Sequence, residues 1–430
     1  MDKRYIILGL AVVLLIVFGT LWFLSSRKPK SAEINFVTYS EDEKNLESLV
    51  ANFESKNPGV KINIIKKDLA NYEVDSLNLI ATNKIDVWGI PVSWLAKQHN
   101  KLSSAPTTLK DYQKVYPKSV SLANTINNNV YGYPLSLDTL VLFANSNLKY
   151  EGNFGQILSK SEQDLMGKDP TNWDDLTAQV RLITSKQDTT ITRSGLAMGT
   201  SAISAAPDIL TLMMLQNGTQ ITNDNNTQAT FHTALNKFGG DSYPAASALD
   251  LYTSFSKSTN NNYSYSDTMG DALRTFSAGK AVYYIDYKSK ESDIKRINPE
   301  LDFTILPIPQ VKETKNPVNY LDYEIFTVPS SSPNQTLAWN FLQYLADPAN
   351  LTDYYVNSQR TPATISGLEN AGNKISTAVD TALTWYNPDL IEVDKIFRGM
   401  INEVAIANKS SQTVLEGAAL KVTALLEQIK

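Results

Sequence analysis

The chain has 430 residues, a formal net charge of −5 and no cysteine, which excludes disulfides and thiolate metal sites. Its first thirty residues contain five Lys or Arg and one Asp, so the rest of the chain carries a net charge of −9. An acidic body of this kind disfavours nucleic acid and anionic membrane surfaces as partners, and it is long enough to bury stable cores in two domains.

The first expected element is a membrane-spanning helix over residues 5–24, because only three of these residues are not strongly apolar. A helix of about 20 residues rises about 30 Å, the hydrocarbon thickness of a bilayer. The alternative is a cleaved secretory signal, whose apolar core of about 7–15 residues ends in small residues. Residues 21–24 (LWFL) are bulky instead, so we predict that residues 1–30 form an uncleaved anchor. Basic residues flank both sides of the span, which leaves its orientation undecided.

Strands and helices then alternate along the chain. Leu46, Leu49 and Phe53 recur at helical spacing and predict an amphipathic helix over residues 43–54. Together with strands expected at 34–37, 60–65 and 85–88 and a helix at 72–81, this βαβαβ order indicates a mostly parallel sheet covered by helices. Further strands are expected at 134–145, 303–308 and 323–328, and further helices at 172–183, 245–255, 335–346, 390–406 and 414–429.

Catalytic chemistry has little support in the sequence. The two histidines, His99 and His232, stand in polar surroundings and far from other good ligands. The glycine-rich phosphate motifs, the nucleophile elbow of hydrolases and the two-histidine zinc motif are all absent. We therefore expect no catalytic residue, no cofactor and no metal site, and the chain is predicted not to be an enzyme.

Seven short strings lie in or beside the expected strands and helices. They are residues 51–62 (ANFESKNPGVKI), 85–88 (IDVW), 130–145 (VYGYPLSLDTLVLFAN), 173–176 (WDDL), 276–284 (FSAGKAVYY), 306–309 (LPIP) and 338–345 (AWNFLQYL). In this order and spacing they resemble the extracellular solute-binding proteins of ABC importers, in the sugar- and oligosaccharide-binding group that includes maltose-binding proteins. The resemblance extends from residue 33 to about residue 365.

The resemblance implies an α/β, two-lobed periplasmic-binding-protein-like fold of type II, which here would follow the N-terminal transmembrane helix. Lobe 1 would comprise residues 31–139 and 324–365, and lobe 2 residues 140–323 and 366–430. Ligand would lie in the cleft between the lobes, at the carboxyl ends of the sheet strands. The two lobes would then close about the hinge and enclose the bound ligand.

A sugar presents an apolar C–H face and a rim of hydroxyls, so its site needs flat aromatic rings and carboxylates. The chain has 21 Tyr and 6 Trp. Candidate ligand-binding residues stand at the ends of expected strands, in the crossings between the lobes or in the C-terminal segment: Tyr39, Trp88, Trp94, Asp138, Tyr287, Asp322, Tyr323 and Trp385. The alternative for each aromatic residue is core packing, because Tyr and Trp bury large apolar areas.

Two departures from the family pattern stand out. Ala144 replaces a tyrosine, and Asp322 with Tyr323 fills a position that relatives keep small. These departures indicate a reshaped cleft.

The sequence thus predicts a membrane-anchored, extracytoplasmic binding protein that captures a carbohydrate and delivers it to ABC permease subunits. The single-pass anchor would hold it at the cell membrane. Two alternatives remain open. One is a two-lobed receptor that signals through a partner, and the other is an extracellular carbohydrate-active enzyme with paired carboxylates.

Overall fold

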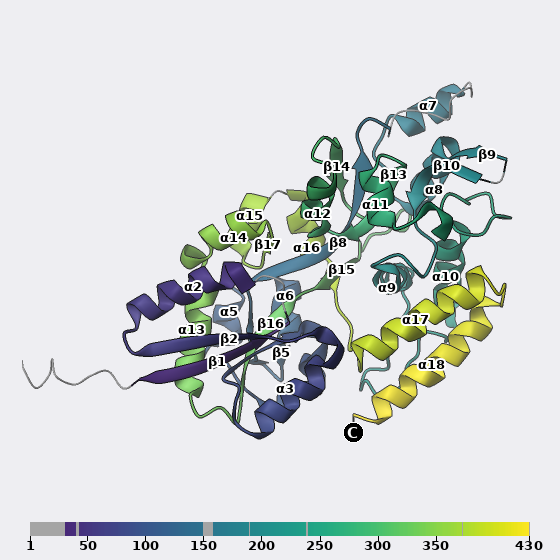
Figure 1. Ribbon diagram of the computed structural model, residues 1–430. Coiled ribbons are helices and arrows are strands. Elements are labelled where there is room, and N and C mark those ends of the chain that lie inside the picture. Colours follow the sequence, from purple (N-terminus) through teal and green to yellow (C-terminus); the bar gives the residue numbers. More distant parts are fainter. Residues whose placement is uncertain are drawn as a thin grey trace, which may run out of the picture.

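The computed structural model describes residues 31–39, 43–148, 158–188, 190–237, 240–371 and 373–429. The membrane-spanning helix expected over residues 5–24 lies outside this part of the chain. Among the described residues, no helix combines the length and the apolar character needed to cross a bilayer. The described chain forms two α/β lobes, each with its own sheet and its own buried core (Figure 1).

Lobe 1 is built around a six-stranded sheet of order β2-β1-β3-β16-β4, with β7 beside β16. Strand β1 pairs in parallel with β2 and β3, whereas β16 runs antiparallel to β3. The strands of lobe 1 are β1 (Ala32–Thr38), β2 (Val60–Lys66), β3 (Val87–Pro91), β4 (Leu102–Ser103), β7 (Tyr133–Pro134) and β16 (Glu324–Pro329), with a hairpin of β5 (Thr125–Ile126) and β6 (Asn129–Val130). Its helices are α2 (Glu43–Lys56), α3 (Tyr72–Ala81), α4 (Leu95–Gln98), α5 (Leu109–Tyr112), α6 (Lys118–Ala123), α13 (Gln335–Ala346), α14 (Thr352–Ser358), α15 (Ile365–Ala371) and α16 (Asn373–Asp380).

Lobe 2 contains an eight-stranded sheet of order β18-β15-β8-β13-β10-β9, with β14 and β17 also paired to β8. The sheet strands are β8 (Ser136–Asn145), β9 (Ser185–Gln187), β10 (Thr190–Ala197), β13 (Ala281–Tyr287), β14 (Phe303–Leu306), β15 (Asn319–Asp322), β17 (Thr361–Pro362) and β18 (Ala382–Leu383), and a hairpin adds β11 (Leu235–Lys237) and β12 (Gly240–Ser242). The helices are α7 (Lys160–Met166), α8 (Trp173–Ile183), α9 (Ala206–Gln216), α10 (Pro244–Ser254), α11 (Ala272–Ser277), α12 (Lys290–Ile297), α17 (Leu390–Ala405) and α18 (Ser411–Glu427).

The chain passes between the two cores three times. Leu137 is buried in the core of lobe 1 and Leu140 in that of lobe 2, and the chain returns between Tyr320 and Leu321. The third passage lies between Ala382 and Trp385, further along the chain than the boundary at residue 365 that we expected. The reason is that α15 and α16 place buried side chains, among them Leu368 and Val379, in the core of lobe 1.

The order of the first elements predicted from the sequence is confirmed: β1, α2, β2, α3 and β3 follow one another. In α2 the predicted apolar face is buried, with Leu46, Leu49 and Phe53 at most 3% exposed. Strand β14 ends at Leu306, earlier than expected, because Pro307 has no N–H to donate to a neighbouring strand. The expected strand over residues 134–145 is divided into β7 and β8.

Candidate ligand-binding site

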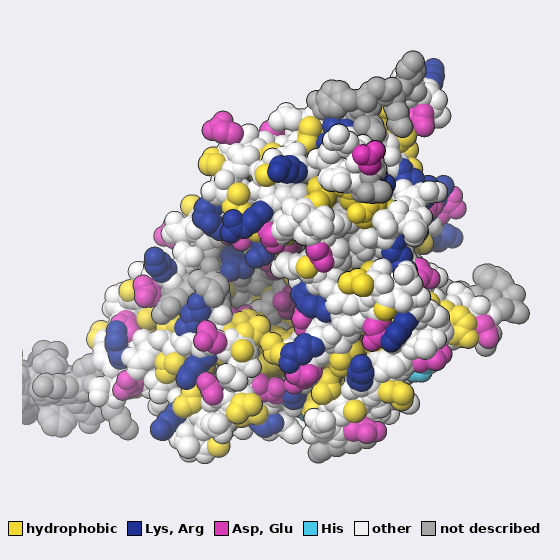
Figure 2. Space-filling model, turned by 45° about the vertical axis from the view of Figure 1, so that its right-hand side comes forward, with side chains coloured by type: hydrophobic (Ala, Val, Ile, Leu, Met, Phe, Trp, Pro, Cys, Tyr) yellow, Lys and Arg dark blue, Asp and Glu magenta, His cyan; other side chains and the backbone are white. Residues whose placement is uncertain are grey.

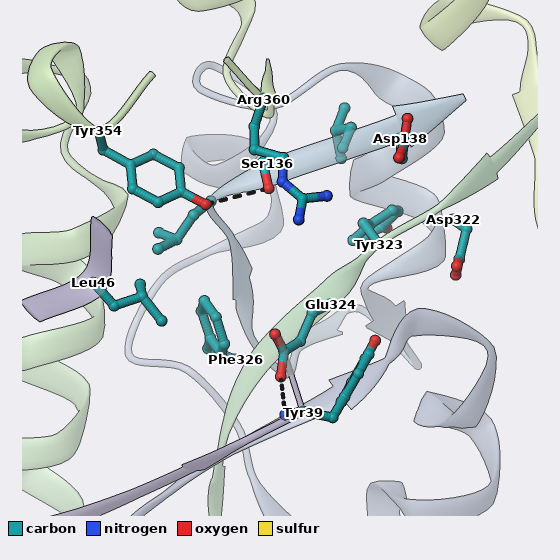
Figure 3. Close-up of a pocket in the computed structure, with 12 residues that line it drawn as sticks. Tyr39, Leu46, Ser136, Asp138, Asp322, Tyr323, Glu324, Phe326, Tyr354 and Arg360 are labelled. Carbon is teal, nitrogen blue, oxygen red and sulfur yellow. Dashed lines mark hydrogen bonds between the residues drawn. The ribbon is translucent and has the colours of Figure 1, made fainter. Parts of the chain in front are cut away.

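A pocket of about 230 Å³ lies where the chain crosses between the lobes. Figure 2 shows that the surface is hollowed between the two lobes, and Figure 3 shows the pocket with the residues that line it. The pocket combines the carboxyl end of β1, the start of β8, the junction of β15 with β16, and α14 with the loop that follows it. Its lining residues are Tyr39, Leu46, Leu135, Ser136, Leu137, Asp138, Asp322, Tyr323, Glu324, Phe326, Tyr354 and Arg360.

Two acidic residues are cross-strand neighbours in the strands that pass between the lobes. Strands β8 and β15 are antiparallel, and their register sets Asp138 opposite Asp322. The Oδ1 atom of Asp138 accepts hydrogen bonds from the backbone N–H of Thr139 at 3.1 Å and of Ser289 at 3.2 Å. Burial nevertheless raises the pKa of Asp138 to about 6; the hydrogen bonds from Ser289 and the charge of Arg360 oppose this shift, and Asp322 adds to it. The pKa of Asp322 is also raised above its ordinary value by desolvation at the lobe junction, although its side chain keeps exposed surface.

A guanidinium and a third carboxylate complete the polar side of the pocket. The Arg360 side chain points into the pocket between Asp138 and Glu324 (Figure 3). Glu324 is held by lobe 1: its Oε1 accepts a 2.7 Å hydrogen bond from Thr38 Oγ1 and a 3.4 Å bond from the backbone N–H of Tyr39. A Cβ atom at Gly89 would lie 1.9 Å from Glu324 Oε1, so only glycine on β3 leaves room for this carboxylate.

The opposite side of the pocket is largely apolar. Leu46, Phe326 and Tyr354 lie there, on the side of the pocket that is away from Asp138 and Asp322 (Figure 3). The hydroxyl of Tyr354 lies 3.5 Å from Ser136 Oγ, and the Tyr354 ring is buried. The pocket therefore has an apolar wall, whose residues expose little surface, and hydrogen-bonding groups beside it.

Lobe 2 contributes a second group of polar residues near Asp322. Asp208 is half-buried in the first turn of α9, and burial raises its pKa to about 7, with a further contribution from Asp322 and an opposing hydrogen bond with Tyr287. Burial, together with Asp208 and Asp322, also raises the pKa of Tyr287 and of Tyr320. These residues extend the acidic region from the crossing strands onto lobe 2.

Four of the eight residues proposed from the sequence come together in the pocket: Tyr39, Asp138, Asp322 and Tyr323. Tyr323 is 5% exposed, and its hydroxyl donates a 2.8 Å hydrogen bond to Asn124 inside lobe 1. Tyr287 lies in the group around Asp208, and Trp385 is hydrogen-bonded to Tyr320 of the same group. The Trp385 ring stacks on Phe397 at 6.2 Å and is 9% exposed.

The structure does not bring Trp88 and Trp94 to this pocket. Trp88 has no exposed surface, because β3 lies between β1 and β16 and all five of its residues are buried. Trp94, in the short turn of helix that follows β3, is 3% exposed. The Trp94 ring packs 6.3 Å from the Tyr72 ring within lobe 1. The core-packing alternative therefore describes their positions in this structure.

Sequence reasoning missed Glu324, Phe326, Tyr354, Arg360 and Asp208. Alternation along a strand would have pointed to the first two, because residues two apart share one face and Asp322 was already a candidate. No comparable signal marks Tyr354 and Arg360, which come from a helix and a loop remote in sequence. Asp208 lies in the first helical turn, where an acidic residue is common without any ligand.

The acidic residues do not form a metal site. Within the described ranges, no group of three or more His, Asp or Glu side chains is arranged to hold a metal ion. The carboxylates are spread along the cleft, which suits contacts with several points on one ligand.

A two-lobed α/β molecule with a half-apolar, half-acidic pocket at its crossing strands is of the class that binds a small solute between its lobes. The chain belongs to the bacterial extracellular solute-binding protein family, whose model matches residues 48–378. That family consists of binding proteins, not enzymes. No curated protein sequence matches the chain.

Solved structures share the fold. The sugar-binding protein MalE from Xanthomonas citri superposes with a TM-score of 0.73 at 16% identity, covering 92% of this chain and 98% of that one. The GacH receptor of Streptomyces glaucescens, studied unliganded and with acarbose, gives 0.70 at 17% identity, covering 93% and 100%. An ABC substrate-binding protein from Listeria monocytogenes in complex with cycloalternan gives 0.67 at 15% identity, covering 92% and 99%.

Proposed function

We propose that the protein captures a carbohydrate between its lobes and delivers it to an ABC importer. The observation that carries the proposal is the two-sided pocket at the lobe junction. Leu46, Phe326 and Tyr354 form the apolar wall of the pocket but are at most 4% exposed, so we assign the contact with the C–H face of a sugar ring to the half-buried Tyr39. Carboxylates and Arg360 supply the polar groups. Carboxylates accept and guanidinium groups donate hydrogen bonds, so together they match hydroxyls, which do both.

The structural neighbours support a carbohydrate as the ligand class. The GacH receptor was studied with acarbose, the Listeria protein with cycloalternan, and a cyclo/maltodextrin-binding protein with maltotetraose. The identities of 14–17% support only the shared fold, so the proposal depends on the pocket of this chain. Tyr39, Asp138, Tyr287, Asp322 and Arg360 are the ligand-binding residues we propose, with Asp208 on lobe 2.

A screen of thermal unfolding tests this function, because a ligand that binds only the folded state raises the melting temperature. Maltotetraose, cellotetraose, xylotetraose and chitotetraose serve as sugars, and tripeptides and spermidine as non-sugar competitors. The full chain is kept in a detergent without a sugar headgroup. We expect a sugar to give the largest shift. A shift with a peptide or spermidine alone would contradict a carbohydrate function.

The N-terminal helix would keep this binding protein at the cell surface beside its permease. The proposal rests on the apolar run over residues 5–24 and on the extracellular character of the family. Protease added to intact cells should release a fragment of nearly the size of residues 31–430. A fragment that appears only after lysis would contradict this topology, and a soluble mature protein without the segment would show that it is cleaved.

A further inference from the structure

The two lobes also meet at a second place, where α3 and α4 of lobe 1 approach the start of α17 and the end of α18 in lobe 2. Residues of these elements border a cavity of about 370 Å³, and Figure 1 shows α3 on the side of lobe 1 that is nearest to α17 and α18. Lobe 1 lines it with Glu73, Leu77 and Lys97, among others, and the C-terminal part of the chain with Pro388 and Leu425, among others.

Lys97 of α4 forms the polar contact across this junction. Its Nζ atom donates a 2.8 Å hydrogen bond to the backbone carbonyl of Pro388 and lies 2.6 Å from Glu73 Oε1. Gln98 Nε2 also donates a 2.6 Å hydrogen bond to Glu73 Oε1, which fixes the carboxylate. The side chains of Lys97 and Glu73 are 16% and 19% exposed, so water screens this pair less than an ion pair at the surface.

The chain around Pro388 links the two cores. Trp385, before it, and Val393, after it, are buried in the core of lobe 2, whereas Leu390 at the start of α17 packs against the core of lobe 1. Tyr386 lies near Glu73: burial raises the pKa of its hydroxyl, and the charge of Glu73 raises it further. The first turn of α17 is thus held by lobe 1 while the rest of the helix belongs to lobe 2.

We propose that Glu73, Lys97 and the Pro388 carbonyl form an interlobe clasp that holds the lobes together in the ligand-free protein and thereby raises ligand affinity. The effect on affinity rests on the proposed function; the effect on lobe separation does not. In this proposal the rotation that opens the cleft moves the core of lobe 2, and α17 with it, away from α4. Such a rotation lengthens the bond between Lys97 and Pro388 and withdraws Leu390 from lobe 1. The clasp therefore lowers the free energy of the closed form relative to the open form, and a ligand that needs the closed form binds more tightly.

The absence of cysteine allows the lobe separation to be measured directly. Spin labels at Leu122→Cys on α6 and Leu420→Cys on α18, both more than half exposed, report the distance between the lobes by pulsed electron paramagnetic resonance. The full chain, in a detergent without a sugar headgroup, is compared with Lys97→Met, which keeps the apolar stem near the Trp94 ring and removes the donor and the charge. Lys114→Met is the matched control, because the ion pair of Lys114 with Asp111 also belongs to lobe 1 but is 66% and 56% exposed.

We expect Lys97→Met to increase the long-distance population in the ligand-free protein and Glu73→Gln to increase it less, while Lys114→Met matches the parent. Maltotetraose affinity should fall about three- to tenfold in Lys97→Met, with an unchanged melting temperature for each lobe. Coincident distance distributions for the parent, Lys97→Met and Lys114→Met would overturn the clasp. Failure of maltotetraose to bind the parent would count against the choice of sugar and leave the distance result to decide on the clasp.

Discussion

The end of β3 and the crossing of β8, β15 and β16 both looked like binding regions in the sequence, but they have opposite environments. Trp88 is fully buried, whereas Asp138 and Asp322 are cross-strand neighbours that line the pocket. Strand β3 lies between β1 and β16 within the sheet of lobe 1. Strands β8 and β15, in contrast, pass from the core of one lobe to the core of the other. A position at an expected strand end is therefore not sufficient to place a side chain in the pocket: Tyr39, just after β1, lines it, whereas Trp88 within β3 does not.

The largest expected effect is on the stability of lobe 1. Replacing Trp88 with Ala removes a fully buried ring from the core of lobe 1 and should lower the free energy of unfolding by about 3–5 kcal/mol. Urea denaturation of the parent and the variant measures this loss, and Trp88→Phe should lose less. A Trp88→Ala variant that unfolds like the parent but no longer binds ligand would place Trp88 in the site after all.

The next effect is on binding. Tyr39 is half-buried at the pocket, and its ring packs edge-on against the Tyr72 ring at 5.2 Å. Tyr39→Ala should weaken sugar binding by about 2 kcal/mol, roughly thirtyfold, because it removes an aromatic contact from the centre of the cleft. Its melting temperature should fall far less than that of Trp88→Ala. A variant with parental affinity would remove Tyr39 from the site.

A third, smaller effect concerns pH. Burial raises the pKa of Asp138 to about 6, above that of an unfolded Asp, near 3.9. Between these values the folded protein binds more protons than the unfolded one, so Asp138 makes the protein less stable as the pH rises from about 4 to about 6. Asp138→Asn keeps an Oδ1 acceptor for Thr139 and Ser289 and abolishes the titration.

The stability of Asp138→Asn relative to the parent should therefore increase by about 1–2 kcal/mol between pH 4 and pH 7. Urea denaturation at both pH values measures the difference, and Asp241→Asn, at an exposed position, serves as the control. A relative stability that is the same at both pH values would show that Asp138 is not desolvated in the folded protein.

The smallest effect shows whether the hydroxyl of Tyr323 belongs to the core of lobe 1 or to the ligand-binding pocket. The Tyr323 hydroxyl donates to Asn124 inside lobe 1, so Tyr323→Phe should cost about 1 kcal/mol of stability because it leaves a buried acceptor without this donor. Sugar affinity should stay within about twofold. A large loss of affinity without a loss of stability would show that this hydroxyl binds the ligand rather than Asn124.

Much of the fold could be predicted from the sequence, because hydrophobic periodicity and the short family strings depend on local structure. The helical spacing of Leu46, Leu49 and Phe53 correctly predicted α2, and the alternating order of elements correctly indicated parallel pairing of β1 with β2 and β3. The position of the third passage of the chain between the lobes was harder to predict, because the packing of α15 and α16 on lobe 1 depends on tertiary contacts.

The site was only partly accessible for the same reason. Asp138 and Asp322 stand at crossings that the family strings locate, and the register of β8 with β15 brings them together. Arg360 reaches the pocket from a loop after α14, and nothing in its neighbourhood in sequence marks it. Trp88 shows the converse: its residue type and its strand end fitted a sugar site, but the enclosure of β3 by two neighbouring strands decided its environment.

Isothermal titration with maltotetraose and the other tetrasaccharides would show directly whether the pocket between the lobes binds a sugar. The full chain is kept in a detergent without a sugar headgroup. We expect one of these sugars to bind with one-to-one stoichiometry. Arg360→Ala removes the guanidinium from the pocket and should abolish or greatly weaken this binding without unfolding the protein. Saturable sugar binding that is unchanged in Arg360→Ala, Tyr39→Ala and Asp138→Asn would contradict the assignment of the pocket between the lobes as the ligand site.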